Sequence, residues 1–407
     1  MTAPTPHDPL EGTLLDGRYR VETQIATGGM STVYRGTDLR LDRPVAIKVM
    51  DSRYSGDQQF LTRFQFEARA VARLSDAGLV AVYDQGLDGK HAFLVMELVE
   101  GGTLRELLRE RGPMPPHAVT AVLRPLLSGL AVAHRAGLVH RDVKPENVLI
   151  SDDGDVKLAD FGLVRAVAQA GITSTSVILG TAAYLSPEQV SSGNAGPRSD
   201  VYSLGILTYE MLTGTTPFTG DTALAVAYQR MDQDVPAPSD EITGVPTQFD
   251  ELVLRATARD PAVRYADALD MGAELAAIAD ELRLPPFRVP APRNSAQHDS
   301  AARHHSRIHE LQTTEQHPAG PPAGPPRNAT RAFTRGPDDW AEPPRQRPPV
   351  ELDTPAGQFA GIELSEFDWA RQRARRMTLV WVLVVLILTG GVAAAAWTLG
   401  SNLTNLI

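Results

Sequence analysis

A run of residues without a charged side chain, Met377–Leu399, most strongly limits how this chain can fold. A helix needs about 20 apolar residues to cross the hydrocarbon layer of a bilayer, and this run is long enough. The alternative is a buried helix of a soluble core, but such a helix rarely extends this far without a polar face. The preceding segment 371–376, RQRARR, is basic, whereas 400–407 has no charged side chain, so the positive-inside rule places the part before the run in the cytoplasm. We therefore predict a single-pass membrane helix at 377–399 and a short tail outside the cell at 400–407.

The composition of the 407-residue chain argues against several functional classes. A hydrophobic content of 43% supports a globular core. A formal net charge of −10 argues against nucleic acid as a direct ligand, because binding a phosphate backbone requires clustered Lys and Arg in excess. The absence of cysteine excludes disulfides, thiolate nucleophiles and cysteine zinc sites. The N-terminus has no basic stretch followed by an apolar run, so we expect no secretory signal peptide.

The pattern of apolar residues changes near residue 100. Before that point, 19–98 consists mostly of short β-branched runs bounded by Gly, Asp or Pro, which is typical of strands, and one helical pattern at 58–74 interrupts them. The segment 103–282 has mainly helical periodicity, and its almost uniformly apolar part at 200–214 predicts a buried helix. Pro125 should kink or interrupt the helix in which it lies. The sequence therefore predicts an α+β fold with a small β-rich lobe and a larger helical lobe.

The segment 285–376 differs in composition from both lobes, because it is rich in proline and histidine and poor in aliphatic residues. Such a segment cannot bury enough apolar surface to fold, so we predict a disordered linker between the lobes and the membrane helix. Its histidines are irregularly spaced, which favours solvated side chains over a metal site.

Four short motifs in a fixed order carry the chemistry. VAIK lies at 45–48, HRDVKPEN at 140–147, ADFG at 159–162 and SPE at 186–188. Each motif alone is a weak signal, whereas all four in this order are specific. They resemble the motifs of the eukaryotic-like Ser/Thr protein kinases, and within these the bacterial receptor-type kinases of actinobacteria. The resemblance extends over about 17–284.

The resemblance implies a two-lobed protein kinase fold, with an N-lobe at 17–98 and a C-lobe at 101–284 after an N-terminal extension at 1–16. It implies a non-specific Ser/Thr protein kinase that transfers the γ-phosphate of ATP to cytoplasmic proteins in signal transduction. Relatives with long extracellular regions carry repeated sensor modules there. Since only 400–407 follows the predicted membrane helix, we expect no extracellular sensor domain.

The resemblance also assigns the catalytic roles, which in phosphoryl transfer consist mostly of positioning groups and neutralising charge. Lys48 would hold the α- and β-phosphates, and Glu67 would pair with Lys48. Asp142 would accept or orient the proton of the substrate hydroxyl, and Lys144 would contact the γ-phosphate. Metal ligands would be Asn147 and Asp160, holding Mg²⁺ or Mn²⁺. Any one of these side chains alone would be read as a surface ion pair, but together they make coincidence remote.

Nucleotide binding is assigned by the resemblance to a wider set of residues: Ala26, Thr27, Gly28, Gly29, Met30, Ser31, Val33, Ala46, Lys48, Glu67, Glu97, Val99, Asn147, Leu149 and Asp160. The backbone of Glu97 and Val99 would bind the adenine edge, behind a Met96 gatekeeper. The loop IATGGMSTVYRG at 25–36 departs from G-x-G-x-x-G spacing at two glycines. Ser31 is usual among the bacterial receptor-type kinases, whereas we expect the methyl group of Ala26 to disturb the first bend or weaken nucleotide binding slightly.

Further residues have structural or regulatory roles in the resemblance. Glu188 and Arg264 would form a buried ion pair of the C-lobe, and Asp200 would brace the catalytic loop. We predict autophosphorylation at Thr173 and Thr175. The neighbouring residues Ser174 and Ser176 are competing sites, and each phosphate would dock on Arg141 and order the loop.

Three questions of function stay open at the level of sequence. A homodimer is expected, because relatives pair through the N-lobe and the small residues TGGVAAAAW in the membrane run permit close helix packing. A membrane-anchored adaptor that binds partners through its Pro-rich segment, with an inactive kinase fold, is one alternative. A small-molecule phosphotransferase is another, although the Ser/Thr-type segment GTAAYLSPE favours protein substrates.

Overall fold

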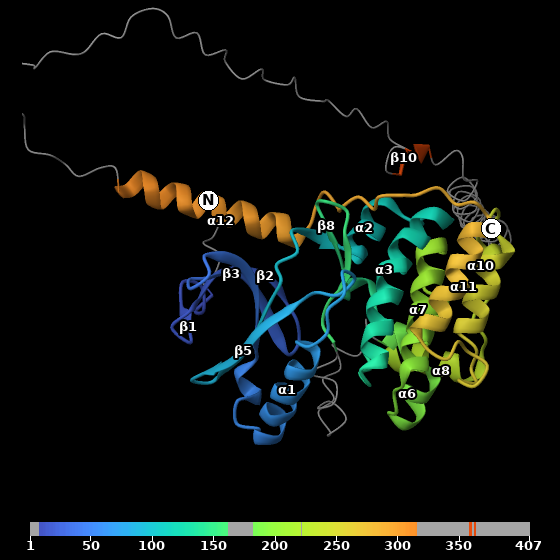
Figure 1. The fold of residues 1–407 in the computed structure, drawn as a ribbon, viewed down its shortest axis with the longest axis horizontal. Coiled ribbons are helices and arrows are strands. Elements are labelled where there is room, and N and C mark those ends of the chain that lie inside the picture. Colours follow the sequence, from blue (N-terminus) through green and yellow to red (C-terminus); the bar gives the residue numbers. More distant parts are fainter. Residues whose placement is uncertain (1–7, 162–181, 221, 316–357, 360–361, 364–407) are drawn as a thin grey trace, which may run out of the picture.

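The computed structural model describes residues 8–161, 182–220, 222–315, 358–359 and 362–363. A β-rich lobe, drawn in blue, lies beside a larger helical lobe, drawn in green to yellow, which confirms the predicted two-lobed α+β fold (Figure 1). The predicted membrane helix at 377–399, the tail at 400–407 and the predicted phosphorylation sites Thr173 and Thr175 lie outside the described residues.

The N-lobe is built on one antiparallel sheet with the strand order β1-β2-β3-β4-β6-β5. The bounds of its elements are Leu14–Leu15 (β1), Tyr19–Thr27 (β2), Ser31–Asp38 (β3), Arg43–Met50 (β4), Ser52–Tyr54 (η1), Gln58–Val71 (α1), Val82–Asp88 (β5) and His91–Met96 (β6). These elements agree closely with the strands and the single helix predicted over 19–98. Asp57 caps α1, since its side chain accepts from the N–H groups of Gln59 and Phe60.

Alternation along β4 directs side chains to two separate apolar clusters. Val45, Ile47 and Val49 pack with Tyr19 and Tyr34 on one face of the sheet. Ala46 and Met50 belong to the cluster that continues into the C-lobe. Because residues two apart share a face of a strand, Lys48 lies on the same face as Ala46 and Met50, toward the other lobe.

The N-terminal boundary of this lobe lies before the predicted residue 17. Leu14 and Leu15 pair with Arg20 and Tyr19, and Leu15 is buried. Tyr34 also donates a hydrogen bond to Asp8 at 2.8 Å. Residues 8–15, predicted as part of an extension, are therefore part of the sheet and its core.

The C-lobe consists of helices around the buried helix α7. Its helices are Leu104–Arg111 (α2), Pro116–Arg135 (α3), Pro187–Ser192 (α6), Pro197–Thr213 (α7), Ala223–Asp232 (α8), Pro238–Glu241 (α9), Thr247–Ala256 (α10) and Ala268–Glu281 (α11), with 3₁₀ turns at Pro145–Asn147 (η2) and Ala182–Tyr184 (η3). Residues 199–213 of α7 are all buried, as predicted. A three-stranded sheet that the helical periodicity did not predict joins Gly101–Thr103 (β7), Val148–Ser151 (β8) and Val156–Leu158 (β9).

Helix α3 continues through Pro125, so of the two expected effects of this proline, a kink or an interruption, the interruption does not occur. Gly78 packs so closely on the backbone of Pro125 that an added Cβ would lie 2.0 Å from its carbonyl oxygen. Among the described residues, α3 is also the one helix long and apolar enough to cross a membrane, but 72% of that span is buried inside the C-lobe. It is therefore part of the core.

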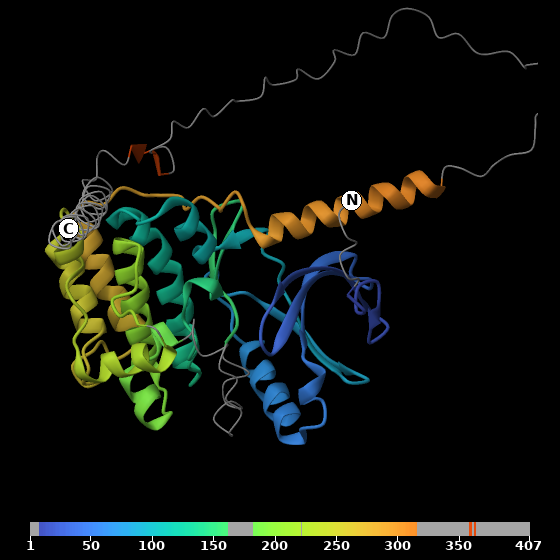
Figure 2. The same cartoon turned by 180° about the vertical axis from the view of Figure 1, so that it is seen from behind.

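The predicted disordered linker at 285–376 is wrong for its first part. The chain beyond α11 packs on both lobes, with Val289, Ser295 and Ser300 buried. It then forms helix α12, Ala296–Glu315, which lies along the N-lobe sheet (orange in Figures 1 and 2). Farther on, the two-residue strands Gln358–Phe359 (β10) and Ile362–Glu363 (β11) pair with each other. Polar contacts to other segments, rather than aliphatic burial alone, hold α12 in place.

Candidate active site

Asp200, near the start of α7, holds the loop that contains the HRD motif. Its carboxylate accepts hydrogen bonds from the backbone N–H groups of His140 and Arg141, both at 2.8 Å, and lies 2.9 Å from His134 Nε2. Asp200 is fully buried, so these charge-assisted hydrogen bonds are shielded from water. The predicted bracing role of Asp200 is confirmed by these contacts.

Two residues that follow the HRD motif, Lys144 and Asn147, converge on the carboxylate of Asp142. Lys144 Nζ lies 2.8 Å from Asp142 Oδ2. Asn147 Nδ2 donates to the Asp142 carbonyl at 2.7 Å and to Asp142 Oδ2 at 3.2 Å. The side chains of Asp142 and Lys144 are 18% and 17% exposed, so both are reachable from outside yet held in place. This geometry suits a carboxylate that orients a substrate hydroxyl next to a cation that neutralises a transferred phosphate.

A second layer of contacts ties the HRD loop to the DFG segment. His140 Nε2 lies 2.9 Å from the carbonyl oxygen of Ala159, and the rings of His140 and Phe161 are 4.7 Å apart. Burial lowers the pKa of His140, although the charge of Asp200 opposes the shift. Arg141 and Asp160 both have positive φ angles, 68° and 60°, which non-glycine residues seldom adopt. Backbone strain of this kind is held by the surrounding contacts and is typical of functional sites.

Lys48, from β4, reaches the DFG aspartate. Its Nζ lies 2.7 Å from Asp160 Oδ1. Burial raises the pKa of Asp160, but the charge and hydrogen bond of Lys48 outweigh this effect, so the net pKa is lowered and the group is a carboxylate at neutral pH.

The expected ion pair between Lys48 and Glu67 is not formed in the described structure, which corrects that expectation. Lys48 forms its ion pair with Asp160 instead. Glu67 is half-buried on α1, and burial raises its pKa, an effect that the charges of Arg141 and Arg63 partly offset. The positive charges that lower the pKa of the Glu67 carboxylate are therefore those of Arg141 and Arg63, since Lys48 is paired with Asp160.

The two expected metal ligands, Asn147 and Asp160, supply an amide and a carboxylate oxygen from adjoining segments. Ala159 N donates to the Asn147 carbonyl at 2.8 Å, which fixes the DFG segment against η2. Over the described residues, no group of three or more His, Asp or Glu side chains could hold a metal by itself. This donor set suits Mg²⁺, which binds through one or two protein oxygens together with substrate phosphates and water.

The apolar residues expected to enclose an adenine ring come from both lobes. Ala46 is buried and pairs with Met96 across the sheet, while Val33 and Leu149 pack partly exposed against the same cluster. The connecting segment after β6 offers the matching polar edge. Glu97 donates its N–H to the Ala81 carbonyl at 2.8 Å, but its own carbonyl and the N–H of Val99 have no hydrogen-bond partner among the described residues. A donor and an acceptor left open beside an apolar slot fit the edge of a purine base.

The loop between β2 and β3 closes through Gly28, whose N–H donates to the Ser31 carbonyl at 2.8 Å. Thr27 pairs with Thr32, and Gly28, Gly29 and Met30 form the turn. Ala26 lies in β2 opposite Val33, next to an irregularity in the strand pairing. Its φ is not positive and its side chain is exposed, so the methyl group meets no strain there. The expected disturbance of the first bend by Ala26 is therefore absent.

Glu188 and Arg264 form the predicted ion pair of the C-lobe, with two contacts of 2.8 and 3.0 Å. Arg264 is buried and also donates to the carbonyl oxygens of Ala258, Arg198 and Arg259. Burial opposes ionisation of Glu188, but the hydrogen bonds from Arg264 and Ser199 prevail, so its pKa is lowered. This pair fastens the SPE segment to the rest of the lobe.

One polar cluster beside the catalytic loop is missing from the sequence predictions. Arg105 of α2 bridges Glu210 of α7 at 2.5 Å and Glu146 of η2 at 2.8 Å, and Tyr184 donates to Glu210. Burial raises the pKa of Tyr184, assisted by the charge of Glu210. Glu146 and Tyr184 lie inside recognisable motifs, whereas nothing local in the sequence connects Arg105 to them.

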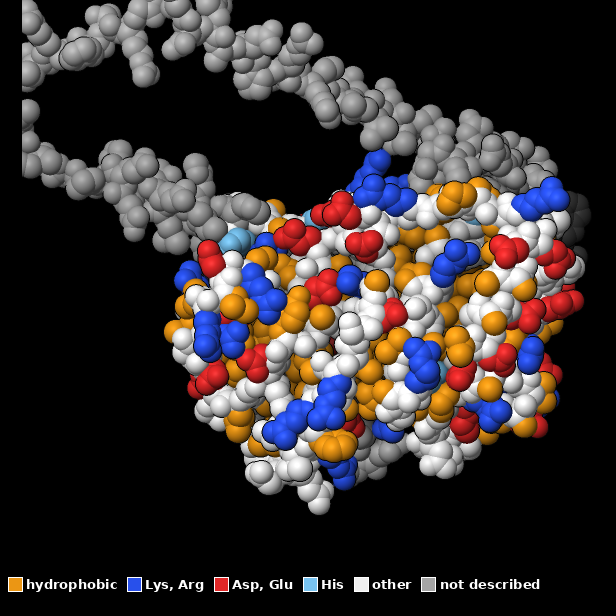
Figure 3. Space-filling model, viewed as in Figure 1, with side chains coloured by type: hydrophobic (Ala, Val, Ile, Leu, Met, Phe, Trp, Pro, Cys, Tyr) orange, Lys and Arg blue, Asp and Glu red, His pale blue; other side chains and the backbone are white. Residues whose placement is uncertain are grey.

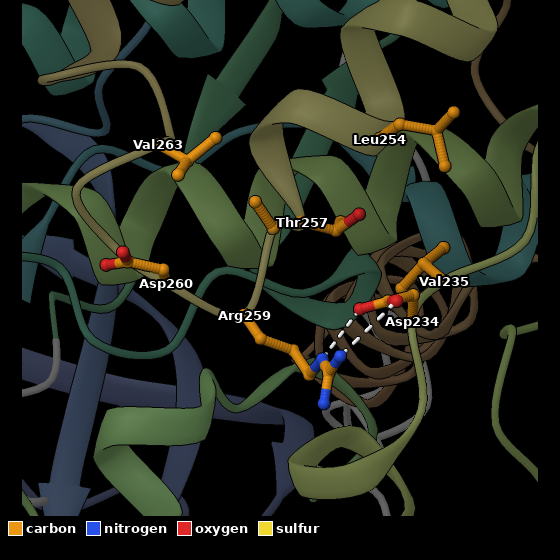
Figure 4. Close-up of a pocket in the computed structure, with 8 residues that line it drawn as sticks. Asp234, Val235, Leu254, Thr257, Arg259, Asp260 and Val263 are labelled. Carbon is orange, nitrogen blue, oxygen red and sulfur yellow. Dashed lines mark hydrogen bonds and ion pairs between the residues drawn. The ribbon is translucent and has the colours of Figure 1, made fainter.

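One pocket lies elsewhere, on the C-lobe near α10. It has a volume of about 570 Å³ and includes Leu254, Thr257 and Val263, with Arg259 paired to Asp234 at 2.6 Å on one side (Figure 4). None of the predicted site residues lines it. On the face shown in Figure 3, basic and acidic side chains are interspersed. The converging charged groups between the lobes, rather than this pocket, therefore mark the functional site.

Comparison with known proteins gives consistent relatives. The family described as protein kinase domain matches residues 19–271. Serine/threonine-protein kinase PknL of Mycobacterium tuberculosis is 71% identical over 400 residues, covering 98% of each chain. The short tail at 400–407 predicts a likeness to this mycobacterial protein kinase L, and the identity confirms it.

More distant relatives share only part of their length with this chain. PknA of Mycobacterium tuberculosis is 41% identical over 295 residues, covering 71% of this chain and 68% of PknA. PrkC of Bacillus subtilis is 39% identical over 275 residues, covering 68% of this chain and 42% of PrkC. Among solved structures, the PknI kinase domain of Mycobacterium tuberculosis has a TM-score of 0.54 at 24% identity and covers 67% of this chain and 100% of that domain, which shows the shared fold.

Proposed function

The chain belongs to the Ser/Thr protein kinases, and on this premise we propose that it transfers the γ-phosphate of ATP to Ser and Thr hydroxyls of cytoplasmic proteins while anchored in the cell membrane. The observation that carries the proposal is the convergence of Lys144 and Asn147 on Asp142, opposite the Lys48–Asp160 pair. Each group needed for phosphoryl transfer is present, and five of them form two contacting sets: Lys48 with Asp160, and Lys144 and Asn147 with Asp142.

The chemistry follows from these contacts. The substrate hydroxyl oxygen forms a bond to the γ-phosphorus as the bond from that phosphorus to the β–γ bridging oxygen breaks, with ADP as the leaving group. Asp142 orients the hydroxyl and takes its proton, and Lys144 lies 2.8 Å from Asp142, where it neutralises charge on the phosphate in transit. Mg²⁺ or Mn²⁺, held by Asn147 and Asp160 together with ATP, supplies further charge neutralisation when bound.

Rearrangement of the N-lobe side of the site is part of the proposal. Lys48 would bind the α- and β-phosphates, leave its ion pair with Asp160, and turn to Glu67. Autophosphorylation at Thr173 and Thr175 favours this state, since each phosphate attracts Arg141 and removes its charge from Glu67. Membrane anchoring rests on the uncharged run at 377–399, and a homodimer through the N-lobe is the arrangement in which one copy phosphorylates another.

Transfer of labelled γ-phosphate by the full chain in detergent tests the proposal. We expect label on the native protein and on a general protein substrate, and a loss of about 10³-fold or more in Asp142→Asn. Asp155→Asn is the matched control, because Asp155 is exposed in the turn between β8 and β9 and undergoes the same change of charge. Mass spectrometry of the labelled protein locates the modified residues.

The outcomes separate the alternatives. Label that is absent from Thr173 and Thr175 in active protein contradicts the autophosphorylation proposal alone. Nucleotide binding without any transfer, in a folded protein and with either Mg²⁺ or Mn²⁺, favours the adaptor. Label on small molecules but not on protein favours a small-molecule phosphotransferase.

A further inference from the structure

The segment after the kinase domain, which we call the strap and define as residues 287–304, follows a continuous path from the C-lobe to the N-lobe. It begins on α3, where the ring of Phe287 packs edge-on against His117 with centroids 5.0 Å apart. Arg288 Nε donates to the Asp153 carbonyl at 2.5 Å, and Val289 is buried. These contacts fix the start of the strap to the C-lobe.

The strap next crosses the connection between the lobes. Arg293 N donates to Glu110 at 2.7 Å, Ala296 N donates to Glu106 at 2.9 Å, and Ser295 Oγ donates to the Gly101 carbonyl. The approach is close enough to require a glycine, since a Cβ on Gly102 would lie 2.4 Å from Pro292 Cγ and 2.7 Å from Ser295 Cβ. Any side chain at position 102 would therefore collide with the strap at this crossing.

The strap ends on β2, the strand that leads into the nucleotide-binding loop. Ser300 Oγ and Thr23 Oγ1 share a hydrogen bond of 2.9 Å, and both residues are buried. Arg303 Nη2 donates to the Gln24 carbonyl at 2.8 Å, and His304 lies 3.4 Å from Glu22. Figures 1 and 2 show α12 lying along this edge of the N-lobe.

These contacts meet β2 where its pairing is irregular. The register with β3 shifts between Val21 and Thr23 and again between Gln24 and Ala26. Irregular pairing disrupts the ladder locally, and at this point the carbonyl of Gln24, which is in register with Tyr34, accepts a hydrogen bond from Arg303. The strap therefore contacts β2 between its two register shifts, at Thr23 and Gln24.

We propose that the strap is a positioning element of the enzyme: by binding β2 at Thr23 and Gln24, it fixes the nucleotide-binding loop against the C-lobe. Residues 28–30 follow Gln24 by only a few positions, so movement of β2 is transmitted directly to the turn that faces the phosphates. Ser300 and Arg303 are the positioning residues, and neither contacts the reacting atoms. The inference rests on the proposed binding of ATP between the lobes.

Because the contact between α12 and β2 is polar, it requires particular hydrogen-bond partners but contributes little net stability. Over 296–304, the part of α12 that contacts β2, these contacts come from Ser300, Arg303 and His304, which are all polar side chains. Hydrogen bonds contribute little net stability each but are costly to leave unmade when buried. A single charge at the buried position should therefore displace the strap while leaving both lobes folded.

The test compares Ser300→Glu with Ala302→Glu in the full chain. Ser300 is fully buried against β2, whereas Ala302 is exposed on the same helix, so both variants add the same charge to α12 but only one buries it. We expect Ser300→Glu to raise the Kd for Mg·ADP and the KM for ATP by about three- to tenfold with little change in kcat, and Ala302→Glu to match the native protein. Circular dichroism confirms that each variant is folded.

A double-mutant cycle of Thr23→Val and Ser300→Ala, with the same binding readout, tests the contact without adding charge. Non-additive changes in Kd support the proposal. Equal affinity in Ser300→Glu and the native protein overturns it, as does equal weakening in Ser300→Glu and Ala302→Glu. If the native protein itself binds no Mg·ADP, the proposed function fails and the inference falls with it.

Discussion

The two halves of the active site differ in how completely they are assembled. On the C-lobe side, Asp200 holds the HRD loop through contacts of 2.8 to 2.9 Å, and Asp142 is already in contact with Lys144 and Asn147. On the N-lobe side, Lys48 is bound to Asp160 and the Lys48–Glu67 pair is open. The proposed catalytic carboxylate is thus preassembled, while the groups that we propose bind the nucleotide have still to exchange partners.

Burial accounts for this difference. Asp200 and His140 are completely buried, so breaking their hydrogen bonds would leave polar groups unsatisfied in the core. The nucleotide-binding loop is exposed at 26–29, and Glu67 is only half-buried. The loop at 26–29 and Glu67 can therefore move at small cost, whereas Lys48, whose side chain is 12% exposed, leaves Asp160 only when another negative charge compensates it.

The largest effect is expected for Asp200→Ala, which removes the carboxylate that holds the HRD loop in place. The change leaves the backbone N–H groups of His140 and Arg141 without their acceptor in the core. We expect the free energy of unfolding to fall by about 4 kcal/mol and kcat to fall at least tenfold. Urea denaturation and steady-state kinetics measure the two effects. Asp200→Asn keeps one oxygen acceptor and should lose less stability and less activity. If Asp200→Ala had the stability and kcat of the native protein, the HRD loop would not depend on this carboxylate.

The next effect, on stability alone, is expected for Glu188→Gln. It leaves the buried charge of Arg264 without its counter-ion, and we expect a loss of about 3 kcal/mol at neutral pH. The matched control is Asp234→Asn, which breaks an ion pair whose two side chains are 46% and 73% exposed and should cost less than about 1 kcal/mol.

The pH dependence of this pair has a definite sign. Because the folded-state pKa of Glu188 lies below its unfolded value of about 4.3, the stabilisation is present above that value and is lost as pH falls through the folded pKa. The difference in Tm between the native protein and Glu188→Gln should therefore shrink as pH is lowered below about 4. A difference that stays constant down to pH about 2 would contradict the role assigned to the ionised Glu188.

A smaller effect, a loss of activity without a loss of stability, is expected for Glu67→Gln. We expect kcat/KM to fall about tenfold, because the pair with Lys48 can no longer form in the active state. Stability should not fall, since burial raises the pKa of Glu67, and its contribution to stability is lost as pH rises through the folded pKa. The variant should gain stability relative to the native protein between pH about 4 and 7. A destabilised Glu67→Gln would show that Glu67 already has a partner that matters for folding.

Two helices of equal length show what the sequence could and could not predict. Helix α3 and helix α12 each span 20 residues. The helical periodicity predicted over 103–282 includes α3, because burial of its own apolar side chains in the core stabilises this helix, although its continuation through Pro125 was not predicted. Helix α12 has no such pattern and depends on distant partners such as Thr23 and Asp152, so local reasoning classified its segment as disordered.

The site shows the same division. Motifs located Asp142, Lys144 and Asn147, because their roles require fixed residue types at fixed spacing. The state of the Lys48–Glu67 pair could not be predicted, since one residue type at one position is compatible with either partner. The role of Arg105 depends on contacts with residues up to 105 positions away, for which spacing carries no information.

The smallest effect is expected for Ala26→Gly, which restores the first glycine of the loop. Ala26 is exposed, pairs with Val33 and has no positive φ, so its methyl group blocks neither the turn nor the backbone of 28–30. We expect the KM for ATP to change less than about twofold, and stability to fall by about 0.5 to 1 kcal/mol, because glycine loses more backbone entropy in a strand. Gly28→Val is the contrasting change, since a branched side chain at the turn restricts the backbone that faces the phosphates. A several-fold fall in KM for Ala26→Gly would show that the N-lobe half of the site is limited by this methyl group, and not by the exchange of Lys48 between Asp160 and Glu67.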